Sequence, residues 1–391
     1  MKILISGAGI AGPTLAYWLA RAGFTPVLVE KAPRLRSGGY IIDFWGAGFE
    51  IAGRMGLIPE LHRTGFVAQD VRVVNGEGKR IAGFPVSAFV RMTRGRYVSL
   101  PRGDLAAAIF RHIEGSVETI FGDSVAAIEE GQAGVRVTFE SGRAGDFDLV
   151  AGADGLHSRV RELVFGAEAN FEKYLGVKAA AFEAARYRPR DELAYVMHTE
   201  VGRQISRVAM GGDRTMFLLT WADADPRLPR DAGSQKEVLR REFGNCGWEG
   251  PAILQALDAA QELYFDRVSQ IRMDGWTRRR VTLLGDAASC VSLLAGEGSS
   301  LAMAGAYLLA WELRRAAPDY ASALARYRQR FLPLVERKQK SALRFAGFFA
   351  PESRTSLWLR NQVMNLLKIG WIADLAVGRD LADHTELPEW G

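Results

Sequence analysis

The stretch Lys2–Lys31, KILISGAGIAGPTLAYWLARAGFTPVLVEK, decides the fold of this chain. Its apolar start predicts a buried parallel strand over residues 2–6, and Gly7 to Gly12 then form a glycine-rich turn. An apolar helix is expected through about residue 22, followed by a second strand over 26–30. This order of strand, glycine turn, helix, strand and acidic residue is the context of a dinucleotide-binding βαβ unit.

Each glycine of the turn has a distinct expected role. Gly7 permits the tight turn, Gly9 lets the backbone approach a pyrophosphate, and Gly12 lets helix and strand pack closely. The helix N-terminus adds free N–H groups and a partial positive charge. Glu30 stands where a carboxylate would bind ribose hydroxyls and repel a 2′-phosphate, so the turn predicts NAD or the ADP half of FAD. Ala11 and Lys31, beside these residues, are included among the expected cofactor contacts.

Composition narrows the class of protein. The 391 residues suffice for two domains, and 48% hydrophobic with 24% charged residues is ordinary for a globular enzyme. The net charge of +5 is spread along the chain, so no nucleic-acid partner is predicted. Two cysteines without CxxC spacing exclude a disulfide framework and favour the cytoplasm, and no metal site is predicted. No apolar run is long enough to predict stable membrane insertion, and either a monomer or a homodimer is compatible with the sequence.

The middle of the chain predicts antiparallel sheet. Residues 66–98 contain turn signals typical of a hairpin, residues 117–150 alternate as in a β-meander, and several short alternating runs follow between 171 and 270. This sheet is expected either to cover a pocket or to form a dimer surface. The candidate substrate residues on it, each with an alternative role in packing or solvation, are His198, Arg203, Arg207 and Trp221.

A second glycine turn lies about 290 residues after the first. A strand over 280–284 ends in Gly285-Asp286, and a loop containing Gly296 and Gly298 then precedes an almost wholly apolar helix. Such a helix is buried, and we expect Ser299 or Ser300 to cap its start. The turn is therefore either a second anion-receptive site or the approach to an ordinary buried helix.

Two further segments carry candidate ligand contacts. Arg36 lies between Arg34 and the pair Gly38-Gly39, in a loop that leads to Asp43 and that suits either a flat anionic ligand or solvent. Arg102 stands at a predicted helix start, where its charge opposes the helix dipole, so it either reaches an anion or is solvated. The basic helical tail contains an amphipathic stretch from 356 to 377. This stretch is expected either to lie at a membrane interface or to pack on the protein's own surface.

Three motifs in register resemble a known family. The first glycine turn with Glu30, Ala153-Asp154-Gly155, and Gly285-Asp286 are similar to the signatures of the single-component FAD-dependent aromatic hydroxylases, the para-hydroxybenzoate hydroxylase group of flavoprotein monooxygenases. Order and spacing match over about residues 1–330. Gly38-Gly39 with Asp43, and the MGLI at 55–58, resemble a subgroup that includes tetracycline-inactivating monooxygenases.

The resemblance implies an α/β fold with an α+β insert: a Rossmann-like FAD-binding domain, an antiparallel-sheet substrate domain and a C-terminal helical tail. We expect the FAD-binding domain at 1–70, 99–170 and 271–330, the substrate domain at 71–98 and 171–270, and helices at 331–391. Arg36 would meet the nicotinamide cofactor. The implied FAD contacts are Gly7, Gly9, Ala11, Gly12, Glu30, Lys31, Asp43, Arg102, Val125, Asp154, Gly285, Asp286, Gly296, Gly298, Ser299 and Ser300.

The implied reaction is hydroxylation of an aromatic, phenolic or polycyclic small molecule, with tetracycline-like compounds among the candidates. NADPH or NADH would reduce FAD, and O2 would form a flavin C4a-hydroperoxide that transfers its distal oxygen. The catalytic residues of the protein remain unassigned. The family commonly has His and Pro after its Gly-Asp-Ala, whereas this chain has Ser289-Cys290-Val291, which leaves the substrate and the flavin geometry open. The alternatives are a flavin dehydrogenase or oxidase without oxygen insertion, and a non-catalytic flavin-binding or small-molecule-binding protein.

Overall fold

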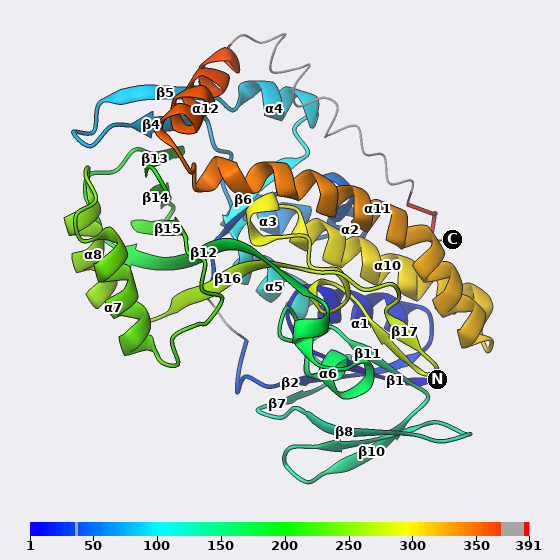
Figure 1. Cartoon of the computed structure of the whole chain (residues 1–391). Helices are drawn as coiled ribbons and strands as arrows, with labels where there is room; N and C mark the ends of the chain where they lie inside the picture. The colour runs from blue at the N-terminus through cyan, green and yellow to red at the C-terminus, as the bar shows by residue number, and fades with distance from the viewer. Residues whose placement is uncertain (36–37, 369–386, 391) are drawn as a thin grey trace.

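The predicted strand–turn–helix–strand unit forms the centre of a six-stranded sheet in the computed structural model, which describes residues 1–35, 38–368 and 387–390 (Figure 1). All neighbouring strands run parallel except the edge pair β17–β18. In sheet order the strands are β17 (Thr277–Arg278), β18 (Val281–Leu283), β11 (Leu149–Gly152), β1 (Lys2–Ser6), β2 (Thr25–Glu30) and β7 (Glu118–Phe121). The first strand is confirmed over its whole predicted length.

Two helices distant in sequence pack together against this sheet. They are α1 (Ala11–Arg21) and α10 (Gly298–Ala316), and α10 is buried from Ala302 to Leu313 on nearly every side. Trp18 of α1 meets Tyr307 of α10 edge to face, with ring centroids 4.8 Å apart. The prediction that the apolar helix after the second glycine turn is buried is therefore confirmed.

The opposite face of the parallel sheet is covered by a small antiparallel sheet (Figure 1). Its strands are β8 (Val125–Glu130), β9 (Val135–Phe139) and β10 (Ala144–Phe147). The predicted meander over 117–150 is wrong at both ends, because β7 and β11 instead join the parallel sheet beside β2 and β1. A separate two-stranded ribbon pairs β3 (Ile41–Trp45) with β6 (Tyr97–Pro101).

The third main layer is a seven-stranded sheet, antiparallel except for the pair β4–β13. In order its strands are β16 (Leu263–Ile271), β12 (Glu172–Ala185), β15 (Arg214–Ala222), β14 (Arg203–Met210), β13 (Ala194–Glu200), β4 (Asp70–Val74) and β5 (Arg80–Pro85). The hairpin predicted within 66–98 is confirmed as β4–β5 at the sheet edge. The division into domains stays a proposal.

The remaining helices connect these sheets and cover them (Figure 1). They are α2 (Gly46–Arg54), α3 (Ile58–Thr64), α4 (Ser87–Met92), α5 (Arg102–Arg111), α6 (Arg159–Phe165), α7 (Ala232–Phe243), α8 (Gly250–Asp258), α9 (Asp286–Ser289), α11 (Tyr320–Phe349) and α12 (Arg354–Leu366). Within the described part of the chain, no helix combines the length and apolar character needed to cross a bilayer.

The C-terminal helices contact both main sheets, α11 at β12 and β17 and α12 at β5. α12 is the described part of the predicted amphipathic stretch, and its Met364 packs against Val73 and Ala82 of the β4–β5 hairpin. Arg360 is buried there and donates to Thr199 Oγ1 and Gln204 Oε1 at 2.8 and 2.7 Å. This part of the tail therefore packs on the protein through Arg360 and Met364, while Trp358, Leu359, Val363 and Leu366 of the same helix are exposed.

Candidate functional site

The first glycine turn is fixed by contacts that exclude larger side chains at two positions. Gly7 adopts φ +106°, and a Cβ there would lie 2.5 Å from the carbonyl oxygen of Ala153. A Cβ at Gly12 would lie 1.9 Å from the carbonyl oxygen of Gly7. These are the tight turn and the close helix–strand approach that the sequence predicted.

Gly9 is different, because the protein leaves space beside it. The nearest atom to a Cβ at this position would be Nη2 of Arg102, at 3.7 Å. The packing of the chain does not require glycine here, so the open space is free for a ligand that approaches the backbone closely.

Glu30 ties the turn to the second strand. Its Oε2 accepts a hydrogen bond from the Ala8 amide at 2.7 Å, and its Oε1 accepts one from the Ala32 amide at 2.9 Å. The carboxylate thus stands at the open end of β2, as predicted, while Lys31 beside it is exposed.

The second glycine turn lies directly against the first. Gly285 adopts φ +60°, and a Cβ there would come within 3.1 Å of the Ala11 Cβ. Gly298 opens α10, and a Cβ at that position would lie 3.8 Å from Asp286 Oδ1. Two turns nearly 290 residues apart in sequence therefore form one continuous surface.

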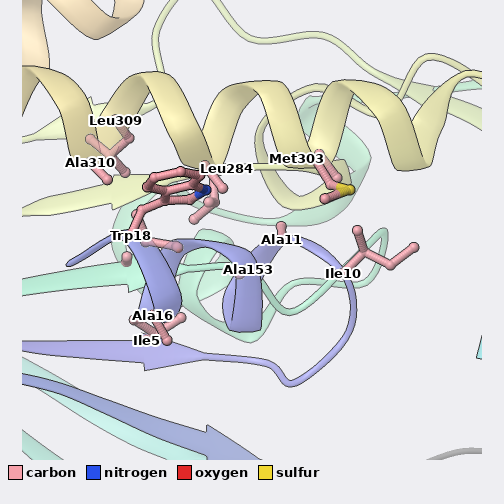
Figure 2. Close-up of a cluster of buried hydrophobic side chains, with 14 of the residues drawn as sticks. Ile5, Ile10, Ala11, Ala16, Trp18, Ala153, Leu284, Met303, Leu309 and Ala310 are labelled. Atoms are coloured by element: carbon pink, nitrogen blue, oxygen red, sulfur yellow. The ribbon is translucent and has the colours of Figure 1, made fainter. Parts of the chain in front are cut away.

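The two helices behind these turns point the same way. Figure 2 shows Ala11 near Met303 at one end of the pair, and Trp18 near Leu309 and Ala310 at the other. Because α1 and α10 run parallel, both N-termini open toward the same side. Their free N–H groups and partial positive charges therefore converge, which suits an extended anionic ligand.

Arg102 adds a full positive charge to this surface. It begins α5, its amide donates to the Tyr40 carbonyl oxygen at 3.0 Å, and it has no ion-pair partner among the described residues. Burial raises the pKa of the Asp286 carboxyl, and Arg102 opposes that rise. Nη2 of Arg102 would lie 3.7 Å from a Cβ at Gly9, and contact between Arg102 and an anion at the first turn stays a prediction.

Asp43 lies on β3, where a cluster of hydroxyl groups orients it. Its Oδ1 accepts from Ser99 Oγ at 2.6 Å, Tyr97 Oη at 2.7 Å and Tyr195 Oη at 2.9 Å. Burial, and then the charge of Asp43, raise the pKa of both tyrosines. Oδ2 of Asp43 has no hydrogen-bond partner in the described part of the chain, so it is available to a ligand hydroxyl.

Two other predicted cofactor contacts, Asp154 and Val125, also help to hold the fold together. Asp154 accepts from Ser158 Oγ at 2.5 Å and from the Val160 amide at 3.0 Å at the start of α6, and burial raises its pKa. The Val125 side chain is fully buried, which leaves only backbone atoms for a ligand. Arg36 lies outside the described residues.

The prediction that Ser299 or Ser300 caps α10 is wrong. The helix begins at Gly298 behind Glu297, without a side-chain cap, and Gly296 takes a left-handed conformation before it. Ser299 is buried, while Ser300 Oγ donates to the Trp45 carbonyl oxygen at 2.6 Å and accepts from the Gly48 amide at 2.9 Å. Ser300 therefore joins α10 to α2.

All four candidate substrate residues lie on the face of the seven-stranded sheet that packs against α7 and α8, away from the two glycine turns. Trp221 packs with Phe243 of α7, and Arg207 binds Glu249 and Asp191 through its guanidinium. His198 contacts Trp248, and Arg203 donates to the Glu242 carbonyl oxygen while pairing with Glu200. Arg203 and Trp221 also line an open surface cleft of about 640 Å³ beside α12.

The alternate residues of the same strands point to the other face of the sheet, toward the part of the chain that contains the parallel sheet. Val208, Met210 and Met216 are buried against Tyr40 and Tyr195. Because side chains alternate across a strand, an assignment one residue out of phase moves every candidate to the wrong face. Both faces of β15 are apolar, so the sequence carried no signal to separate them.

One group of described residues lies close enough to share a metal ion: His198, Glu200 and Cys246. Its atoms are already hydrogen-bonded. His198 Nδ1 lies 3.0 Å from the Val74 carbonyl oxygen, and its Nε2 lies 3.2 Å from Glu200 Oε1. Burial raises the pKa of Glu200, but hydrogen bonds from the Gly247 amide, Arg203 and His198 outweigh it and lower the value to about 2. We therefore assign no metal here.

Comparison with known proteins decides the family. A flavin-dependent monooxygenase from an unknown prokaryotic organism is 32% identical over 399 residues, covering 100% of this chain and 99% of the relative. The FAD binding domain family matches residues 1–340. The chain belongs to the FAD-binding monooxygenase family. This membership favours the monooxygenase over the dehydrogenase, oxidase and non-catalytic alternatives.

Two further proteins are similar to this chain. An uncharacterized protein, Rv1260, of Mycobacterium tuberculosis is 37% identical over 349 residues, covering 86% of this chain and 91% of the relative. The crystal structure of the tetracycline destructase Tet(51) superimposes with a TM-score of 0.84 at 31% identity, covering 99% of each chain. The mixed α/β fold and the C-terminal helices are therefore confirmed.

The residues present fit FAD. The parallel helix starts, the space at Gly9 and the guanidinium of Arg102 suit a pyrophosphate, and the second turn lies beside them. Sequence reasoning identified these elements. It missed Tyr97 and Tyr195, because hydroxyl groups from separate strands meet at Asp43 only in the folded chain.

Proposed function

We propose that this monooxygenase uses NADPH or NADH and O2 to hydroxylate a neutral aromatic, phenolic or polycyclic small molecule. The observation that carries the proposal is the convergence of the two glycine turns beside Arg102. FAD, when bound, supplies the redox chemistry, by accepting a hydride from the nicotinamide and activating oxygen. The chain contributes binding, orientation and exclusion of water.

Each proposed contact has a physical role. Gly9, the start of α1 and Arg102 would bind the pyrophosphate, and Glu30 would bind the ribose hydroxyls. Asp286 and the start of α10 would lie at the flavin end. The partial positive charge there would stabilise negative charge on the reduced ring, by up to about 2 kcal/mol in a partly buried setting.

The substrate class follows from the flavin-facing side of the seven-stranded sheet. Val208, Met210 and Met216 form a buried apolar and polarizable layer there, beneath Tyr40 and Tyr195, whereas Arg207 is directed to the far face and paired. An uncharged ring system suits this surface better than a carboxylate. Oδ2 of Asp43, which has no hydrogen-bond partner among the described residues, would accept a hydrogen bond from a hydroxyl of the cofactor or the substrate. A tetracycline-like compound is a candidate, because Tet(51) is described as a tetracycline destructase.

The test is substrate-stimulated oxidation of NADPH or NADH by the purified yellow protein, with mass analysis of the product. We expect neutral phenols or tetracyclines to gain one oxygen atom, and matched benzoates to be turned over poorly. Hydrogen peroxide as the sole product with every compound would contradict the hydroxylation. Preferred turnover of carboxylates would contradict the assignment of the substrate-facing side.

A further inference from the structure

The loop between α9 and α10 has an unusual backbone conformation at Ser292. Residues 289–297 contain no proline, yet Ser292 adopts φ +148°. A non-glycine residue in this region is strained, and the strain persists only where surrounding structure fixes it. Within the loop, Ser292 Oγ accepts a hydrogen bond from the Leu294 amide at 3.2 Å, and further hydrogen bonds reach the loop from outside it.

Two buried glutamines provide such a restraint. Gln270 on β16 is fully buried, and its Nε2 donates to the Val291 carbonyl oxygen and to the Gln339 carbonyl oxygen, each at 2.8 Å. Gln339 on α11 donates through its Nε2 to the carbonyl oxygens of Ile271 at 2.7 Å and Cys290 at 3.1 Å. A primary amide has two N–H donors, and both amides use both of them here.

The contacts extend to both ends of the loop. The Ile271 amide donates to the same Cys290 carbonyl oxygen at 3.1 Å, which joins the start of the loop to β16. Lys338, next to Gln339 on α11, pairs with Glu297 at 2.9 Å just before α10. Two adjacent residues of one C-terminal helix thus contact both ends of the loop.

We propose that Gln270 and Gln339 are positioning residues that fix the loop 289–297 in the shape required at the flavin ring. This inference rests on the proposed function, which places the ring at Asp286 and the start of α10. The amides act through backbone carbonyls and do not contact the cofactor. Proline rings would restrict the backbone of such a loop, but this loop contains none. The hydrogen bonds from the two glutamines restrict its backbone instead. The long helix α11 thereby becomes part of the flavin site.

The primary variant is Gln339→Met, which preserves side-chain volume and removes both donors. The Ile271 amide still binds Cys290 in this variant, so we expect the fold to be kept. We expect faster amide hydrogen exchange across residues 289–297 in the FAD-free protein and a shifted visible spectrum of bound FAD. We also expect an about tenfold higher dissociation constant for FAD, equivalent to about 1.4 kcal/mol. Gln270→Met should act in the same direction.

The matched control is Gln204→Met, which removes another fully buried glutamine amide, on β14. It should lower thermal stability without moving the exchange of residues 289–297 or the flavin spectrum. If Gln339→Met does not fold, Lys338→Met, which releases the Glu297 end of the loop, replaces it and is expected to show the same changes.

The outcomes separate this proposal from the proposed function. Unchanged exchange and an unchanged spectrum in the glutamine variants would overturn the positioning role while leaving the monooxygenase intact. Wild-type protein that takes up no FAD would overturn the proposed function, whereas hydrogen exchange would still show whether the glutamines fix the loop.

Discussion

Gly9 separates what the fold requires from what a ligand requires. A methyl group at this position meets no atom closer than 3.7 Å, whereas the same change at Gly12 would place a Cβ 1.9 Å from a backbone oxygen. The two glycines belong to one turn, but only one of them is needed for packing. Substitution can therefore test the ligand site without disturbing the sheet.

We predict that Gly9→Ala folds with a stability within about 0.5 kcal/mol of wild type, since it fills open space. Its dissociation constant for FAD should rise at least about tenfold, because the methyl group would occupy the approach to the pyrophosphate. Isothermal titration with FAD and thermal unfolding of the FAD-free protein measure the two quantities. Gly12→Ala is the control and should fail to fold. If Gly9→Ala binds FAD with wild-type affinity, the proposal that the pyrophosphate lies at this turn is contradicted.

At the second turn we predict that Asp286→Ala loses bound flavin. Asp286 Oδ1 would lie 3.8 Å from a Cβ at Gly298, at the start of α10, so removal of this carboxylate changes the charge at the proposed ring site. Absorbance in the visible range after purification gives the flavin content, and circular dichroism gives the fold. A folded variant that retains its full yellow colour would contradict the placement of the ring site.

At the scale of elements, the sequence predicted which segments form strands and helices better than it predicted their faces. The first unit, the β4–β5 hairpin and the buried α10 all follow from apolar periodicity and turn residues. The orientation of β13 to β15 does not, because apolar residues occupy both faces of β15 and only tertiary packing selects one. The cap of α10 was also beyond prediction, since Ser300 bonds to α2, which is distant in sequence.

The orientation of β14 can be tested through Arg207. Its side chain is 2% exposed and bridges Glu249 and Asp191 on the face covered by α8. We predict that Arg207→Met lowers the free energy of unfolding by on the order of 3 kcal/mol, because two carboxylates lose a buried partner. FAD affinity and substrate KM should stay near wild type. Urea unfolding and steady-state kinetics measure these values. A raised KM at unchanged stability would show that Arg207 faces the substrate.

At the scale of the molecule, the nucleotide-binding part and the seven-stranded sheet share an ionic network. His157 precedes α6, and its ring nitrogens lie 2.9 Å from Glu168 and 3.3 Å from Asp266 of β16. Arg161 and Arg267 also pair with Glu168, at 2.8 Å each. Any relative movement of the two parts during turnover has to strain or break these contacts.

This network makes stability depend on pH through His157. Hydrogen bonds to Asp266 and then Glu168 raise the pKa of His157 to about 10, against about 6.5 in an unfolded chain. The folded state therefore binds the proton more tightly, so the stabilisation is complete below about pH 6.5 and is lost as pH rises toward about 10. Because the side chain is 47% exposed, solvent screening limits the contribution to about 1 kcal/mol.

We predict that His157→Gln is less stable than wild type at pH 6, and that this difference shrinks steadily up to pH 10. Comparing the variant with wild type at each pH cancels the titration of groups that the two proteins share. The measurement is urea unfolding at pH 6, 8 and 10. As a control, His112→Gln removes a histidine that contacts the Ala108 carbonyl oxygen within its own helix region, outside the network. A stability difference for His157→Gln that stays constant across this range would show that the imidazolium does not join the two parts.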